Sequence, residues 1–204
     1  LTDSDLKAAD PDGMHDHIVS FAEQVRRGRE RARGISVPFP SDGVDHVVLA
    51  GMGGSAIAGD LLAALVEPVS PVPVTVSRSY GLPRFVDENT LVIISSYSGN
   101  TEETLAGFDA ALERGSFVYC ITSNGHVQQR AEAVELPYQQ LPGGMPPRAA
   151  LGYSLAAVVH LATALDLIDV SPEAWSEAAD VLAEMTRELD QRGGNRALDI
   201  AEAL

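Results

Sequence analysis

The sequence predicts an α/β fold: a doubly wound, five-stranded parallel sheet flanked by helices, with extra N- and C-terminal helices. Two patterns support this prediction. Short, nearly continuous runs of Val, Ile and Leu recur between residues 44 and 139, as in strands buried on both faces of a parallel sheet. Helical patterns separate these runs, as expected for crossover helices, and the ligands of such sheets lie beyond the carboxyl ends of the strands.

Residues 1–36 form the predicted N-terminal helical segment. Apolar residues recur there at steps of three and four, which is typical of an amphipathic helix: Met14, Ile18, Phe21, Ala22 and Val25. Five arginines lie at the end of this pattern, where cations suit the helix dipole: Arg26, Arg27, Arg29, Arg31 and Arg33. We interpret them as a solvated helix end, because the chain as a whole is acidic.

The central segment, residues 37–168, is predicted to hold the sheet. Four strong apolar runs and a weaker fifth are the predicted strands, at residues 47–50, 72–76, 91–94, 117–121 and 133–136. The helices of this segment are predicted at residues 54–66, 100–114 and 149–167, the last of them after a loop rich in proline and glycine.

The C-terminal segment, residues 169–204, is predicted to contain two more helices. Ser171 and Pro172 form the pattern of an N-cap followed by proline at the first helical position. This helix is expected to end near Gly193 and Gly194, and an amphipathic pattern over residues 195–204, ending at Leu204, predicts the next one. We expect these helices to lead to a further domain of a longer protein.

Composition and charge exclude several kinds of protein. Lys and Arg total 14 and Asp and Glu total 29, so the net charge is −15. Such a chain repels nucleic acid and anionic lipid, so we expect neither as a partner, and any bound phosphate must be held locally. The single cysteine excludes an intrachain disulfide, no apolar run approaches the ~18 residues of a membrane span, and the polar start is unlike a secretory signal. We therefore expect a cytoplasmic protein. No metal site is predicted, because His15 and His17 have no third ligand nearby.

The first motif with chemical meaning is GMGGSAIAGD, residues 51–60, directly after the first predicted strand. Glycines at a strand-to-helix turn let backbone amides approach an anion at the start of the helix. The motif also fits the dinucleotide fingerprint G-x-G-x-x-A, which calls for an acid about 20 residues further on. Arg78 lies there instead and could face a 2′-phosphate, so an NADP-binding domain remains an alternative.

The second motif is SSYSGNTEET, residues 95–104, directly after the third predicted strand. The hydroxyls of Ser96, Ser98 and Thr101 surround a turn that opens a helix, and together with its amides they form a neutral site for a phosphate dianion. A simple helix cap needs one hydroxyl, and a dinucleotide domain gives no reason for a second phosphate-binding turn. The third motif is PPRAALGY, residues 146–153, in which two prolines hold Arg148 at the start of the long helix.

These motifs together resemble the sugar isomerase (SIS) domain family, most closely the bacterial and archaeal bifunctional phosphoglucose/phosphomannose isomerases. The resemblance extends from about Asp12 to the end of the chain, and it also includes the segments SRSYGLP and ITSNG. It implies a SIS domain that binds a phosphohexose between residues 53–55 and 96–101. The implied phosphate-binding residues are Gly53, Gly54, Ser55, Ser96, Ser98 and Thr101.

The resemblance also implies a reaction, the aldose–ketose isomerisation of a phosphohexose through an enediol, with no metal or redox cofactor. Arg148 would stabilise the enediolate, while a second SIS domain and a dimer partner would supply the catalytic Glu and His. We therefore expect a homodimer, and we expect this chain alone to bind a sugar phosphate without isomerising it. Ala56 and Ala58 stand where the family usually has glycines, so a non-catalytic sugar-phosphate sensor remains an alternative.

Overall fold

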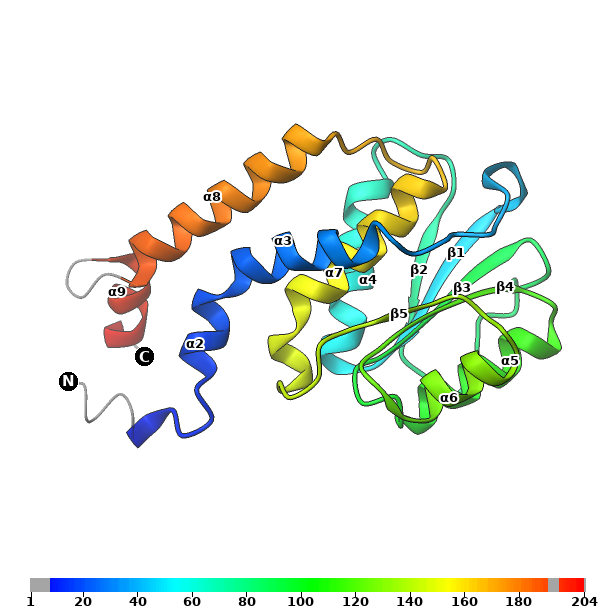
Figure 1. Cartoon of the computed structure of the whole chain (residues 1–204), viewed down its shortest axis with the longest axis horizontal. Helices are drawn as coiled ribbons and strands as arrows, with labels where there is room; N and C mark the ends of the chain where they lie inside the picture. Colours follow the sequence, from blue (N-terminus) through cyan, green and yellow to red (C-terminus); the bar gives the residue numbers. More distant parts are fainter. Residues whose placement is uncertain (1–7, 191–194, 204) are drawn as a thin grey trace.

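A computed structural model describes residues 8–190 and 195–203, and a five-stranded parallel sheet forms its centre (Figure 1). The strands lie in the order β2-β1-β3-β4-β5, and every neighbouring pair is parallel. The chain therefore builds the sheet outward from β1 in both directions, which confirms the doubly wound fold. The strand bounds are β1 (His46–Gly51), β2 (Val74–Ser77), β3 (Thr90–Ser96), β4 (Phe117–Thr122) and β5 (Tyr138–Gln140).

Helices cover both faces of the sheet. On one face α4 (Gly53–Val66) and α7 (Leu151–Ala164) pack over side chains such as Leu49 and Ile93. On the other face α5 (Glu102–Glu113) and α6 (Gly125–Ala133) pack over side chains such as Val48 and Ile94. Neighbouring residues of one strand thus enter different cores, and this explains why the strands are nearly continuous apolar runs.

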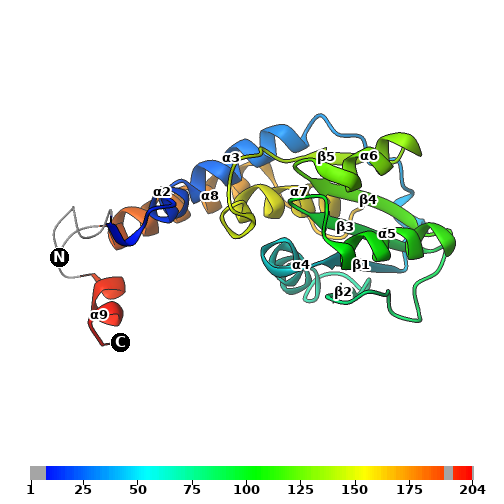
Figure 2. The same cartoon turned by 90° about the horizontal axis from the view of Figure 1, so that it is seen from below.

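Helices α2 (Met14–Val19), α3 (Phe21–Ala32) and α8 (Pro172–Asp190) form an arm that extends away from the sheet (Figures 1 and 2). The arm joins the domain where α3 packs against α7. A Cβ atom added at Gly28 of α3 would lie 2.6 Å from the Ala156 Cβ of α7, so the two helices approach this closely only because residue 28 is glycine. The N-terminal helical pattern predicted from the sequence corresponds to two helices, α2 and α3, which meet at Ser20.

The fifth strand was predicted in the wrong place. Residues 133–136 hold the end of α6 and a turn, with Val134 half exposed and Glu135 at a φ of 55°. β5 lies further on, where Tyr138 pairs with Cys120 and Gln139 pairs with Ile121. The buried Gln139 interrupts any apolar run, so this short strand is recognisable only from its pairing with β4.

The two helices predicted in the C-terminal segment are present where the structure describes the chain. Ser171 Oγ accepts a hydrogen bond from the Ala174 amide at 3.1 Å and so caps α8, and Asn195 Oδ1 accepts one from the Leu198 amide at 3.0 Å at the start of α9 (Arg196–Ala203). The predicted helix end near Gly193 and Gly194, and Leu204, lie outside the described residues. Among the helices of the described part, none is both long and apolar enough to cross a membrane.

Candidate functional site

The first two motifs meet at the carboxyl ends of β1 and β3, which are neighbours in the sheet. Ser95 Oγ donates a hydrogen bond to the Ser55 carbonyl at 2.9 Å, and the Tyr97 amide donates one to Ser55 Oγ at 3.1 Å. These two buried hydrogen bonds join the turn that opens α4 to the turn that opens α5. We call residues 53–55 and 96–101 the cradle.

The first half of the cradle is the uncapped start of α4. First-turn amides such as those of Gly53 and Gly54 have no intrahelical acceptor, as in any helix. The N-cap residue, Met52, provides no side-chain capping bond to them either. They lie at the positive end of the helix dipole, which favours an anion. Ser55 accepts from the Tyr97 amide, so its own hydroxyl hydrogen remains free to donate.

The second half contributes hydroxyl groups. Ser96 Oγ and Thr101 Oγ1 lie 3.0 Å apart, and the Gly99 amide donates to Ser96 Oγ at 3.1 Å. Whichever of the two hydroxyls donates to the other, one hydrogen of the pair remains for an outside acceptor. Ser98 is exposed and accepts only a 3.3 Å bond from the Asn100 amide, and Thr101 makes no side-chain cap on α5.

The third motif lies against the cradle. Arg148 belongs to the 3₁₀ turn η2 (Pro147–Ala149), and a Cβ added at Gly54 would lie 2.8 Å from its Cα. Its side chain is exposed and, within the described part of the chain, forms no ion pair. All seven site residues predicted from the sequence therefore lie at one edge of the sheet, and a surface ion pair does not account for Arg148.

Tyr97 is a positioning residue that the sequence analysis missed. Its hydroxyl donates to the Pro142 carbonyl at 2.7 Å and accepts from the Met145 amide at 3.0 Å, while its backbone forms part of the second turn. The side chain is 8% exposed. Tyr97 thus ties the loop that carries Arg148 to the cradle, and the one signal for it is a large aromatic residue within a motif of small polar ones.

Two of the carboxylates near the cradle, Asp60 and Glu102, already have a polar partner, and Glu103 lies in the first turn of α5. Asp60 of α4 forms an ion pair with Arg78, and Glu102 of α5 accepts a hydrogen bond from the Tyr80 hydroxyl at 3.2 Å. This hydrogen bond and the charge of Glu103 raise the pKa of Tyr80. Arg78, the cation on which the NADP alternative depended, therefore has an acidic partner of its own.

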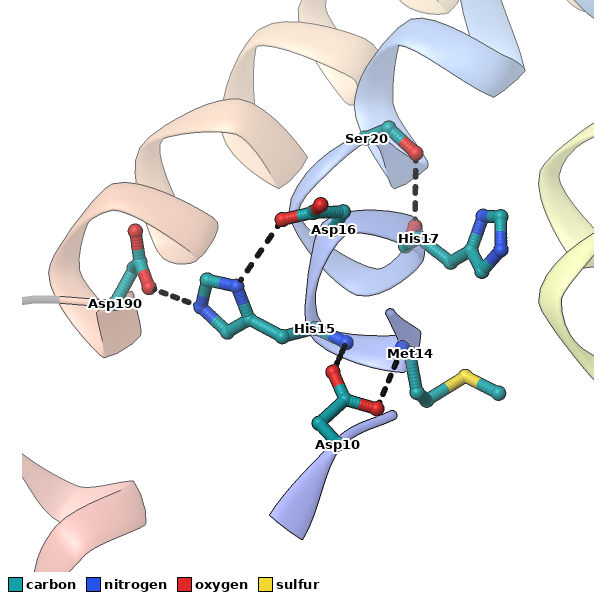
Figure 3. A network of polar contacts seen from close by, with 7 residues as sticks. All are labelled: Asp10, Met14, His15, Asp16, His17, Ser20 and Asp190. Atoms are coloured by element: carbon teal, nitrogen blue, oxygen red, sulfur yellow. Dashed lines mark hydrogen bonds and ion pairs between the residues drawn. The ribbon is translucent and has the colours of Figure 1, made fainter. Parts of the chain in front are cut away.

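The remaining polar candidates form no second centre. Figure 3 shows the His15 ring directed toward Asp190 and the His17 ring directed away from it. The described residues hold no group of three side chains that could ligate a metal. Cys120 is fully buried, and burial raises the pKa of its thiol to about 12, so it is an inert core residue. Ala56 and Ala58 are also fully buried within α4, and Ala58 packs into the core between this helix and the sheet.

The sheet order and the two joined turns define a SIS domain, and comparison with known families agrees. The sequence model of the SIS domain family matches residues 43–141, and this part of the chain is a SIS domain. Among its relatives is the bifunctional phosphoglucose/phosphomannose isomerase of Caldicellulosiruptor bescii, 40% identical over 172 residues, which are 84% of this chain and 51% of that protein. The enzyme of the same name from Thermoplasma acidophilum is 34% identical over 174 residues, 85% of this chain and 52% of the relative. The chain thus spans about half the length of these curated relatives.

Solved structures share the fold. A hypothetical protein from Thermus thermophilus superposes with a TM-score of 0.64 at 22% identity, covering 92% of this chain and 46% of that one. The C-terminal domain of glucosamine-fructose-6-phosphate aminotransferase from Francisella tularensis also gives a TM-score of 0.64, at 15% identity, covering 86% of this chain and 54% of that one. At these identities the likeness concerns the fold alone.

Proposed function

We propose that this chain is the phosphate-binding SIS domain of a phosphoglucose/phosphomannose isomerase-like protein, and that the cradle holds the phosphate of a phosphohexose. The observation that carries the proposal is the junction of two uncapped helix starts at one sheet edge, bordered by hydroxyl donors. A phosphate there accepts hydrogen bonds from the first-turn amides of both helices. It also accepts from Ser55, from Ser98 and from one hydroxyl of the Ser96–Thr101 pair.

This mode of binding suits an acidic protein. The chain carries a net charge of −15, so a dianion is held by short-range dipoles rather than by a general positive field. Arg148 then places a full cation beside the cradle, and it borders the first turn of α4 through Gly54. It lies next to the phosphate site, where the sugar carbons of a bound phosphohexose would extend.

For the whole protein we propose an aldose–ketose isomerase. The phosphate anchors the sugar, and this remote binding energy aligns C1 and C2 with the acid and base groups. Isomerisation passes through a cis-enediolate, whose negative charge Arg148 stabilises. The names of the relatives support this reaction class. No redox cofactor or metal is required by this chemistry.

We further propose that this chain alone binds its ligand without turnover. A base must come within about 3 Å of the C2 proton. Glu102 and Glu103 lie in the first turn of α5, beside the proposed phosphate and at the wrong end of the sugar, and Asp60 lies in the middle of α4 and is paired with Arg78. If a longer chain also binds without turnover, the protein is the sugar-phosphate sensor considered above.

The test is calorimetric titration of the chain with fructose 6-phosphate. We expect Ser98→Ala to weaken binding by about 1–3 kcal/mol, the value of a hydrogen bond to a charged group. Ser96→Ala should act similarly, whereas Ser176→Ala on the exposed side of α8 is the matched control and should change nothing. Unchanged affinity for both cradle variants would sink the assignment.

We also propose a cytoplasmic homodimer. Apolar side chains remain exposed along one stripe of α4, with Ile57 41%, Leu61 38% and Leu65 49% exposed. The apolar side chains of α7, by contrast, are largely buried within the chain. A contiguous exposed apolar stripe is unusual on a monomer. Sedimentation velocity tests the dimer: a monomer at all concentrations that also fails to bind a hydrophobic dye would contradict it.

A further inference from the structure

A pocket of about 220 Å³ lies among α3, α7 and α8 and shares no residue with the cradle. Its polar lining comes from Arg29 of α3 and its C-cap residue Arg33 and from His160 and Thr163 of α7, and the indole of Trp175 closes one side. His160 lies nine residues beyond the start of α7, about 14 Å along the helix axis from the end that adjoins η2. The pocket therefore belongs to the root of the arm and not to the cradle.

The pocket concentrates positive charge that the protein leaves unneutralised. Arg29 and Arg33 are four residues apart and so lie on the same face of α3. Other arginines of this run are paired: Arg26 with Asp180 at 2.7 Å and Arg27 with Glu23 at 2.7 Å. Among the described residues, neither Arg29 nor Arg33 has a carboxylate within 4 Å.

Arg29 is held in place without being neutralised. Its Nη1 donates to the Pro172 carbonyl at 3.2 Å, and its guanidinium carbon lies 5.8 Å from the centre of the Trp175 ring. Burial and the nearby charge of Arg33 lower the pKa of Arg29, and Glu173 acts weakly in the opposite direction. An anion between the two guanidinium groups would relieve this repulsion.

Two buried nitrogen atoms without a hydrogen-bond partner belong to residues that line the pocket. Trp175 is 8% exposed, and within the described part of the chain its Nε1–H has no acceptor. His160 Nε2 is buried and likewise without a partner there. Buried N–H groups in proteins are nearly always hydrogen-bonded, so the indole of Trp175 lacks an acceptor among the described residues.

We propose that this pocket binds a small organic anion through a carboxylate or phosphate group. Arg33 and Arg29 make charge-assisted hydrogen bonds to the anionic group, on the side of the pocket that the indole of Trp175 closes. Val159 and Val170 line the pocket and contact a short carbon skeleton. The volume lies below the ~300–1,000 Å³ typical of larger ligands, so the ligand has only a few carbon atoms.

The single tryptophan of the chain makes this proposal directly testable, because intrinsic fluorescence reports on the pocket alone. The full chain is titrated with inorganic phosphate and, separately, with succinate, at an ionic strength kept constant with sodium chloride. We expect a saturable change in Trp175 fluorescence with at least one probe. Saturation by phosphate alone identifies a phosphoryl ligand, and saturation by succinate alone identifies a carboxylate.

Variants separate this pocket from the cradle. Arg33→Gln should weaken the fluorescence-detected binding at least tenfold. The matched control is Arg31→Gln, which removes an exposed arginine of the same helix that does not line the pocket and should leave binding unchanged. Ser98→Ala should not alter this titration, and Arg33→Gln should not alter the calorimetric affinity for fructose 6-phosphate. The absence of a saturable response to either probe, or equal responses of wild type and Arg33→Gln with native circular dichroism, would overturn the proposal whatever happens at the cradle.

Discussion

The cradle and the arginine pocket are two polar sites built in opposite ways. The cradle consists of two short segments, each continuous in sequence, that offer backbone amides and small hydroxyls. The pocket is assembled from side chains that are far apart in the sequence, from Arg29 to Trp175. The anion binding proposed for it depends on the charged guanidinium groups of Arg29 and Arg33. The cradle therefore depends on main-chain geometry as well as on its hydroxyls, whereas the pocket depends on the charges of its side chains.

The largest expected effect tests the dependence of the cradle on its backbone. Gly99 has a φ of +68°, and a Cβ added there would lie 1.7 Å from the Asn124 carbonyl oxygen. Gly99→Ala should therefore lower the free energy of unfolding by about 3–4 kcal/mol, since backbone strain and steric overlap add. The control is Gly13→Ala, which has a similar φ of +65° with no atom within 4 Å and should cost about 1 kcal/mol. Chemical denaturation measures both, and equal losses would show that the turns are not held by this close contact.

The next effect distinguishes the two serine positions of the cradle. Ser55→Ala leaves the Tyr97 amide buried without an acceptor, so it should destabilise the fold by about 1–3 kcal/mol. Ser98 is exposed, so Ser98→Ala should change the stability by less than about 0.5 kcal/mol while it weakens ligand binding. Thermal unfolding in the absence of ligand checks this; equal stability of the two variants would remove Ser55 as the link between the turns.

A smaller effect is expected from Tyr97→Phe, which keeps the ring but removes the hydroxyl. The Pro142 carbonyl and the Met145 amide both lose a partner, at a cost of about 1 kcal/mol because the loop lies partly in solvent. The loop that carries Arg148 should then be more mobile, and amide hydrogen exchange at residues 142–148 should accelerate. Unchanged exchange would mean that the two prolines alone hold Arg148 in place.

The smallest effect concerns the end of the arm, where an exposed side-chain pair joins α2 to α8 (Figure 3). His15 Nε2 lies 2.6 Å from Asp190 Oδ1, and this hydrogen bond raises the pKa of His15 above its ordinary value of 6.5. The folded state favours protonated His15, so the stabilisation is present below pH 6.5 and disappears as the pH rises through the raised pKa.

Comparison of wild type with His15→Gln from about pH 5 to 8 should therefore show a stability difference only on the acidic side. We expect less than about 0.5 kcal/mol, since both side chains are largely exposed. A difference that grows toward alkaline pH would contradict the assigned direction.

The sequence alone was sufficient for four of the five strands, for the doubly wound class of the sheet and for the two turns that follow β1 and β3. Buried parallel strands require continuous apolar runs, and a strand-to-helix turn that receives an anion requires glycines and hydroxyls at fixed local positions. These signals lie within ten residues of one another, as in the segments 51–60 and 95–104. The role of Arg148 beside a bound sugar was inferred only from the family resemblance.

Only the tertiary structure decided the features that depend on contacts between distant segments. β5 is a strand because β4 offers it an edge, although its own residues are polar. Tyr97 is important because its hydroxyl meets a loop 45 residues further along the chain. The arginine run seemed from its composition to be a solvated helix end, and that description suits Arg26 and Arg27, which form exposed ion pairs. It does not suit Arg29, because the packing of α8 against α3 places Trp175 beneath it and desolvates its charge, which no local pattern in the sequence encodes.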